Sequence, residues 1–152
     1  MRSLADALQS IAATLWAGGL WVTGFVVAPV LFATLQDRVL AGQLAGKLFG
    51  LMAWIGIGCA AYLLIYRFTR FGAGAFRQGV PWLVLLMLAL VMAGEFGVQP
   101  IMAALKEQAL PRQVMESVFS DRFAVWHGVS SGLYVIQSVL GAVLVIVLGR
   151  GK

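Results

Sequence analysis

Residues 123–149 form the stretch that decides the fold, FAVWHGVSSGLYVIQSVLGAVLVIVLG, in which no charge occurs between Arg122 and Arg150. An apolar run of about 18 residues or more is long enough to cross the ~30 Å hydrocarbon core of a bilayer as a helix. The stretch therefore predicts a membrane-spanning helix, and it raises the question of whether the rest of the chain is built in the same way.

Three other charge-poor stretches have the same character. The longest separates Asp6 from Asp37, and another contains a single charged residue, Glu95. The first stretch is too long for the apolar region of a cleaved signal peptide, which spans about 7–15 residues, so we expect a retained helix. The predicted membrane spans are approximately residues 8–35, 48–66, 81–104 and 122–148.

The composition indicates a membrane protein and excludes an ordinary soluble enzyme. Of the 152 residues, 61% are hydrophobic and 11% are charged, whereas soluble domains average about 25% charged residues. The length allows one domain, residues 1–152. The net charge of +5 fits lipid headgroups better than nucleic acid, because no basic stripe is present. We therefore predict an all-α, four-helix, up-down transmembrane bundle in contact with the lipid bilayer.

The distribution of Lys and Arg predicts the orientation of the spans. The two ends of the chain and the connection 67–77 share one side and hold six basic residues, whereas the other side holds five. Because cytoplasmic loops carry the excess of Lys and Arg, we expect a multi-pass protein of the cell inner membrane with both termini in the cytoplasm.

Prolines, glycines and an amphipathic segment add detail to this bundle. Pro29 is expected to bend the first span, and Pro100 to bend or end the third. Apolar side chains share one face of residues 101–121, which predicts an amphipathic helical extension between the third and fourth spans. No repeat of 20–50 residues is visible. Small residues that allow close helix packing, within the bundle or between copies of the chain, are Gly42, Gly46, Gly50, Gly128 and Gly132.

Two ionisable residues, Glu95 and His127, lie inside predicted spans. Such residues are costly in lipid and are therefore candidates for function. Each lies about one helical turn from the same end of adjacent antiparallel spans, so we expect a hydrogen bond or ion pair between them, directly or through one water. Gln99 lies one turn from Glu95 on the same helix face.

A polar stripe follows the fourth span. Its members recur at intervals of three and four residues and therefore share one helix face, which we expect to point into the bundle because lipid cannot satisfy their hydrogen bonds. They are His127, Ser130, Ser131, Tyr134, Gln137 and Ser138.

Three interpretations of this stripe remain open. Its polar groups can satisfy one another and hold the helices together, they can line a binding pocket or conduction path, or His127 can bind a metal or haem. Because His127 is the only histidine, a haem would need a ligand of another type or the histidine of a second copy. No hydrolase, metalloprotease or nucleotide-binding motif occurs, so we assign no catalytic and no metal-binding residue.

The stretch FAVWHGVSSGLYVIQSVLG (123–141) resembles the last helix of the transmembrane protein 205-like family, whose bacterial members carry a domain of unknown function. Residues 25–62 resemble the first loop and second helix of that family, and Pro100 matches a proline at the end of its third helix. The resemblance implies a four-helix integral membrane protein. A weaker similarity, in TLWAGGLWVTGFVVAP (14–29), links the first span to the copper-resistance-D and membrane protoporphyrinogen-oxidase families, but the histidine of those oxidases is missing here.

The sequence favours a small, non-enzymatic membrane protein of the accessory, binding or transport type, without a cofactor. We expect it to form a homo-oligomer or to bind another membrane protein, and to contain an internal polar site around His127 and Glu95. The alternative is a haem- or porphyrin-linked oxidoreductase, or a copper-handling protein, that uses His127. A Soret band that is lost in His127→Ala would identify the alternative.

Overall fold

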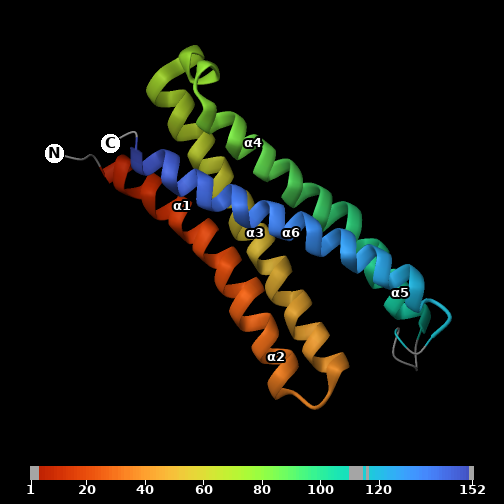
Figure 1. Cartoon of the computed structure of the whole chain (residues 1–152). Helices are drawn as coiled ribbons and strands as arrows, with labels where there is room; N and C mark the ends of the chain where they lie inside the picture. Colours follow the sequence, from red (N-terminus) through yellow and green to blue (C-terminus); the bar gives the residue numbers. More distant parts are fainter. Residues whose placement is uncertain (1–3, 110–114, 116, 151–152) are drawn as a thin grey trace.

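The computed structural model describes residues 4–109, 115 and 117–150. Most of these residues form long helices that lie lengthwise against one another, with both termini at one end (Figure 1). The first long helix consists of α1 (Leu4–Val22), the π-helical η1 (Thr23–Val27) and α2 (Ala28–Thr34). The second consists of α3 (Arg38–Phe71) and the 3-10 helix η2 (Gly72–Arg77).

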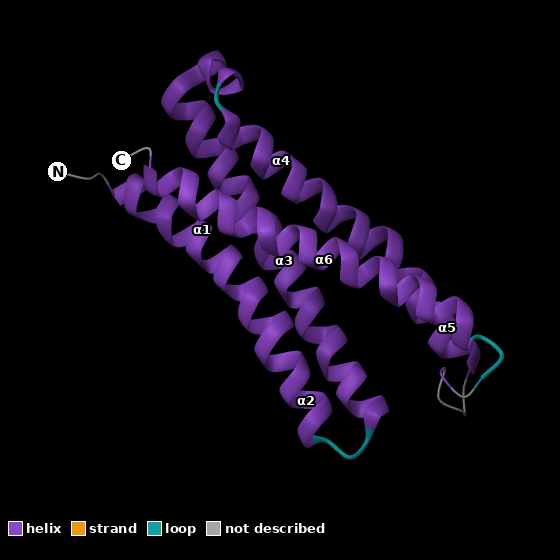
Figure 2. Cartoon of the chain, in the orientation of Figure 1, coloured by secondary structure: helices purple, strands orange, loops and turns teal. Residues whose placement is uncertain are grey.

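The third long helix consists of α4 (Gly79–Met92), the π-helical η3 (Ala93–Val98) and α5 (Gln99–Ala109), and the fourth is α6 (Ser120–Arg150). The described connections between them are short, and no strand occurs in the described residues (Figure 2). The prediction of four long apolar helices is therefore confirmed.

The exterior of this bundle is apolar. All four long helices are long and apolar enough to cross a membrane, with mean hydropathy between 1.8 and 2.2 in their most apolar windows. Only 17–28% of those windows is buried inside the structure, so most of their residues are at least partly exposed. Leu51 and Val125, for example, are 57% and 65% exposed. Soluble monomers rarely expose contiguous apolar patches larger than a few hundred Å², so this surface suits contact with lipid.

Each long helix contributes at least one large, fully buried side chain to the centre of the bundle. Among them are Trp16, Leu63, Met87 and Leu144, one from each helix. The helices contact one another in a ring, in which α1 packs on α3 and α6, and α4 packs on the same two helices. Every helix therefore has two neighbours, and the core lies between all four.

Both helices that contain an internal proline also contain a π-helical segment. Pro29 follows η1 by two residues, and Pro100 follows η3 by two residues. Proline lacks an N–H and its ring clashes with the carbonyl four residues earlier, and a wider π turn is one way to accommodate this disturbance. The first helix is disturbed near Pro29, as predicted, but Pro100 does not end the third, which continues to Ala109.

The first and third long helices repeat one another in a way that the sequence analysis missed. Both carry the motif Phe-x-Val-x-Pro, at residues 25–29 and 96–100. When Pro29 is aligned with Pro100, four buried positions of the first helix fall on four buried positions of the third. Buried Gln9, Ala13, Trp16 and Leu20 align with buried Val80, Val84, Met87 and Val91.

The second and fourth helices repeat one another as well. When Gly56 is aligned with Gly141, buried Met52, Cys59 and Leu63 fall on buried Gln137, Leu144 and Leu148. Trp16 lies against Gly56, and its equivalent Met87 lies 3.7 Å from the position of a Cβ on Gly141. At these positions the burial pattern of the second helix pair, 79–150, follows that of the first pair, 4–77.

The two pairs diverge beyond the π segments. There α2 packs mainly on α3, and α5 packs on α6 (Figure 1). Met102, Leu105 and Ala109 of α5 are buried, as expected for the amphipathic extension of the third span. The expected extension of the fourth span is not formed at Met115 and Val118. Both residues are exposed and precede the start of α6. Residues 110–114 and 116 of the expected extension lie outside the described part of the chain.

Candidate functional site

Glu95 lies in η3 and faces the second long helix. Its carboxylate oxygen Oε1 is 3.5 Å from the position that a Cβ would occupy on Gly50. The side chain is half-buried, and it has no hydrogen-bond or ion-pair partner among the described residues. Gly50, predicted as a packing residue, therefore allows an acidic side chain to approach the backbone of α3.

Tyr134 reaches the same turn of α3 from the fourth helix. Its ring contacts Phe49 edge-on, with centroids 5.0 Å apart, and its hydroxyl donates a 2.6 Å hydrogen bond to the carbonyl oxygen of Leu20. The same ring lies against Gly24 in η1, where no side chain would fit. Because Phe49 and Gly50 are consecutive, Tyr134 and Glu95 belong to one layer of the bundle.

Gln137 adds a polar group to the interior one turn further along α6. The residue is 4% exposed, and its amide nitrogen Nε2 has no hydrogen-bond partner among the described residues. Neighbouring Ser138 is also buried, and its hydroxyl donates to the carbonyl oxygen of Tyr134. The predicted inward orientation of the stripe thus holds for Tyr134, Gln137 and Ser138.

His127 and Ser131, in contrast, are exposed. They lie on the same face of α6 as Tyr134 and Ser138, which contact the first helix through Leu20 and Trp21. Near the start of α6 this face has no covering helix, because α2 packs on α3 instead. The sequence could not indicate that the bundle diverges at this level.

The expected hydrogen bond between Glu95 and His127 is not formed. The imidazole of His127 stacks on Phe123 at 5.9 Å, and the ammonium of Lys106 lies 5.5 Å from the centre of the same Phe123 ring. The expectation rested on equal depth along two helices, whereas the two side chains point in different directions around their helix axes. The described residues thus show no direct Glu95–His127 hydrogen bond, and the pairing through one water stays a prediction.

The remaining predicted site residues, all of them in the described part of the chain, form no hydrogen bond, ion pair or ring contact with Glu95 or with the ring of Tyr134. Ser130 and Gln99 are half-buried, and the hydroxyl of Ser131 donates to the carbonyl oxygen of His127. Gly46, Gly128 and Gly132 have open space where a Cβ would be, and Gly42 has only the ring of Phe32 within 3.9 Å. Close helix contacts occur instead at Gly19, Gly24, Gly56 and Gly141.

Sequence reasoning also missed the aromatic residues around Glu95. Phe49 contacts Tyr134, and Trp54 contacts Phe96 edge-on with centroids 6.1 Å apart. A signal was available, because Phe49 and Trp54 lie on either side of Gly50, and Phe96 follows Glu95 directly. Scattered aromatic residues in apolar spans are common, so this signal becomes informative only when the helices are placed together.

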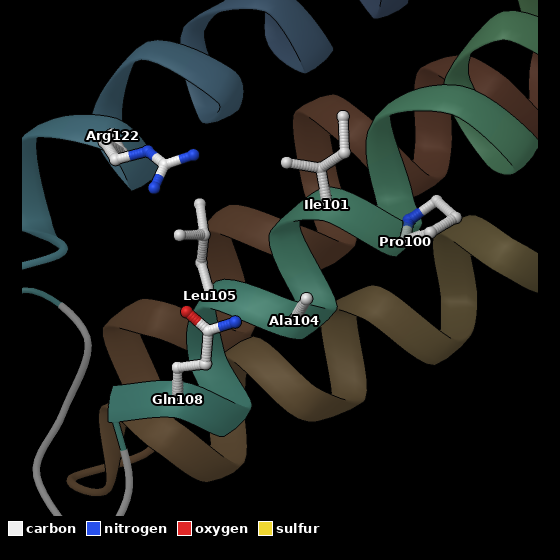
Figure 3. A pocket seen from close by; sticks show the side chains of 6 residues that line it. All are labelled: Pro100, Ile101, Ala104, Leu105, Gln108 and Arg122. Carbon is white, nitrogen blue, oxygen red and sulfur yellow. The ribbon is translucent and has the colours of Figure 1, made fainter.

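A separate pocket of about 330 Å³ lies between α5 and α6. Figure 3 shows Arg122 reaching from α6 toward Leu105 and Gln108 of α5. The lining residues are Pro100, Ile101, Ala104, Leu105, Gln108 and Arg122. None of them was predicted for the site, and the pocket does not include Glu95 or Tyr134. Within the described part of the chain, no three His, Cys, Asp or Glu residues are placed to hold a metal ion.

The described residues form an all-helical protein with four helices of membrane-spanning length and an apolar core that contains a few buried polar side chains, among them Gln137 and Ser138. The chain belongs to the family described as Domain of unknown function (DUF4149), whose match covers residues 11–110. The match includes Glu95 and ends before α6. It agrees with the expected domain of unknown function, although it does not carry the narrower transmembrane protein 205-like name. No curated protein and no solved structure matches the chain.

Proposed function

We propose that this protein is a small multi-pass membrane protein of the binding or transport type, and that its site is the layer around Glu95 and Tyr134. The observation that carries the proposal is the carboxylate of Glu95. It lies within a helix apolar enough to span a membrane, and it has no hydrogen-bond or ion-pair partner among the described residues. A carboxylate in such a place is costly, and ionisable residues inside membrane helices characteristically mark ligand or ion pathways.

The repeated helix pairs support the same conclusion. Many membrane transporters are built from structural repeats, with their sites at the interface between repeats and beside interrupted helices. Here η1 and η3 interrupt equivalent helices, and the layer lies next to both, since Tyr134 contacts Gly24 of η1 and Glu95 belongs to η3. π-Helical segments in other proteins are frequent at functional sites.

The proposal includes an arrangement in the membrane. The four helices cross the inner membrane up and down, with both termini in the cytoplasm, because the side of the termini carries more Lys and Arg. The likeness of HGVSS (127–131) to the transmembrane protein 205-like family agrees with four spans. Gly128 and Gly132 are exposed with open space beside them, which suits contact with a second copy of the chain or another membrane protein.

The accessibility of Gly50 to water tests the proposal. In a Cys59→Ala background, Gly50→Cys places a thiol beside Glu95, where a Cβ has an ordinary 3.5 Å contact. Leu51→Cys is the matched control, because Leu51 is the next residue and is 57% exposed on the apolar exterior. We expect a charged, membrane-impermeant thiol reagent to label Cys at position 50 in liposomes, and position 51 to stay unlabelled.

Labelling of neither position would contradict a water-accessible site, and so would equal labelling of both. Both variants must retain the elution volume and helical circular dichroism of the parent protein, so that unfolding does not explain labelling.

A further inference from the structure

Two aromatic pairs involve the helices that meet at the contact between Glu95 and Gly50. The inner pair is Phe49 and Tyr134, with ring planes at 79°, and the outer pair is Trp54 and Phe96, at 89°. Each pair includes a residue that is next to this contact in the sequence, since Phe49 precedes Gly50 and Phe96 follows Glu95. An acidic side chain thus lies on the same helical turns as residues of both aromatic pairs.

We propose that this cluster binds a lipophilic organic cation, such as a quaternary ammonium or phosphonium ion. The inference rests on the proposed function, in which Glu95 is the centre of a binding site. Aromatic faces attract cations through their negative quadrupole, and the attraction grows when the cation is desolvated. The carboxylate supplies the opposite charge, whose effect is greater in a medium of low dielectric than in water.

The donor set favours an organic cation over a metal ion. Calcium takes six to eight oxygen ligands and magnesium takes six, in many cases with several waters. Glu95 provides a single carboxylate, and no group of three potential metal ligands from His, Cys, Asp and Glu occurs in the described residues. A bulky cation with a spread charge needs no such ligand cage, and apolar and aromatic contacts hold its substituents.

The outer pair gives such a ligand access from lipid. Trp54 is 60% exposed and Phe96 is 51% exposed, and both belong to the apolar exterior. A cation dissolved in the bilayer can therefore contact the outer pair first. Gly50 has no side chain that could cover the carboxylate of Glu95, which therefore faces the backbone of α3 at this position.

The alignment of the two helix pairs predicts one site per chain. Alignment of Pro29 with Pro100 places Gly24 at the position equivalent to Glu95. The aligned position in the first helix pair therefore has no carboxylate, and the ring of Tyr134 fills the space over Gly24. We expect one cation to bind for each copy of the chain.

Equilibrium binding of tetraphenylphosphonium to the purified full-length protein in detergent tests the inference. We expect saturable binding of one ion per chain, and no saturable binding of tetraphenylborate, which has the same shape and the opposite charge. Glu95→Gln should weaken tetraphenylphosphonium binding by about tenfold or more, because it removes the carboxyl group that the proposal assigns to the cation. Glu107→Gln removes an exposed carboxylate from α5 and should bind like the parent.

A second pair of variants tests the aromatic contribution. Trp54→Leu should weaken binding by about threefold to tenfold, as expected for a cation–π contact at a partly exposed site. Trp82→Leu is the control, because Trp82 is similarly exposed, at 57%. It lies near the start of α4, at the end away from η3 and Glu95, and its Nε1 donates to the carbonyl oxygen of Phe76. Each variant is compared only if its elution volume and circular dichroism match the parent.

The inference is overturned if tetraphenylborate binds as well as tetraphenylphosphonium, or if Glu95→Gln binds the cation undiminished. The thiol labelling at position 50 distinguishes a failure of cation binding from a failure of the proposed function. Labelled Cys without cation binding would leave a water-accessible site for another ligand, whereas absence of both would remove the site altogether.

Discussion

The hydroxyl of Tyr134 donates a hydrogen bond to the carbonyl oxygen of Leu20, at 2.6 Å, and so ties the fourth long helix to the first just before η1. The tyrosine ring then crosses Gly24 and meets Phe49 edge-on. One side chain thereby contacts both helices of the opposite pair. The stability of the bundle and the geometry of the proposed site consequently depend on the same residue.

Removal of this hydroxyl should destabilise the bundle modestly. Tyr134→Phe keeps the ring and deletes the hydrogen bond to Leu20, so we expect the free energy of unfolding to fall by about 0.6 kcal/mol, the average for such bonds in membrane proteins. Unfolding in mixed micelles with increasing denaturing detergent measures the change. Tyr62→Phe is the control, since its hydroxyl donates to the carbonyl oxygen of Ala5 over 3.1 Å at an exposed position. Equal losses in the two variants would contradict the importance of the Tyr134 contact.

Gly24 should tolerate no side chain while Tyr134 is present. Gly24→Ala brings a Cβ into the tyrosine ring, so we expect overpacking to cost about 1–3 kcal/mol of unfolding free energy. Gly18→Ala is the matched control in the same helix, because no atom lies within 4 Å of its Cβ position.

A double variant separates this clash from a general effect of alanine in η1. In a Tyr134→Leu background, the ring is gone and the cost of Gly24→Ala should shrink. An unchanged cost in that background would show that the backbone of η1, rather than Tyr134, excludes a side chain.

Gly56 should be equally sensitive because of Trp16. The position of a Cβ on Gly56 lies 2.6 Å from Nε1 of Trp16, a fully buried side chain at the centre of the core. We expect Gly56→Ala to lower the free energy of unfolding by about 1–3 kcal/mol. Gly58→Ala, with open space at its Cβ position two residues later, should change it little. Equal stability of the two variants in the detergent titration would count against the Trp16 contact.

The four helices could be predicted from the sequence because charge-poor stretches of this length have few alternatives. Their ends could not be located as well, since the helices extend past the apolar stretches into charged segments. The second begins at Arg38, where the carboxylate of Asp37 accepts hydrogen bonds from the N–H groups of Val39 and Leu40. Ser, Thr, Asn and Asp commonly cap helices in this way, so the residue type was informative in retrospect.

The candidate site could be predicted only in part. Glu95 was identifiable because it is the single charge inside an apolar stretch, but its partner was not. Depth along a helix follows from residue number, whereas direction depends on which neighbour each face meets. Glu95 accordingly faces Gly50 rather than His127, and His127 remains exposed because α2 packs on α3. The repeat was hidden for a similar reason, since it preserves buried positions more than residue types.

The equivalence of the two helix pairs bears on how such a chain arises. A single hairpin that pairs with a copy of itself would form the same ring of four helices, and Phe49 and Tyr134, which occupy aligned positions, contact each other edge-on. Duplication and fusion of one ancestral hairpin gene would leave this arrangement. Fusion also frees the two halves to diverge, so that one can keep a glycine at position 24 while the other carries an acid at position 95. An ancestral homodimer would have had to place two like charges, or none, in the same layer.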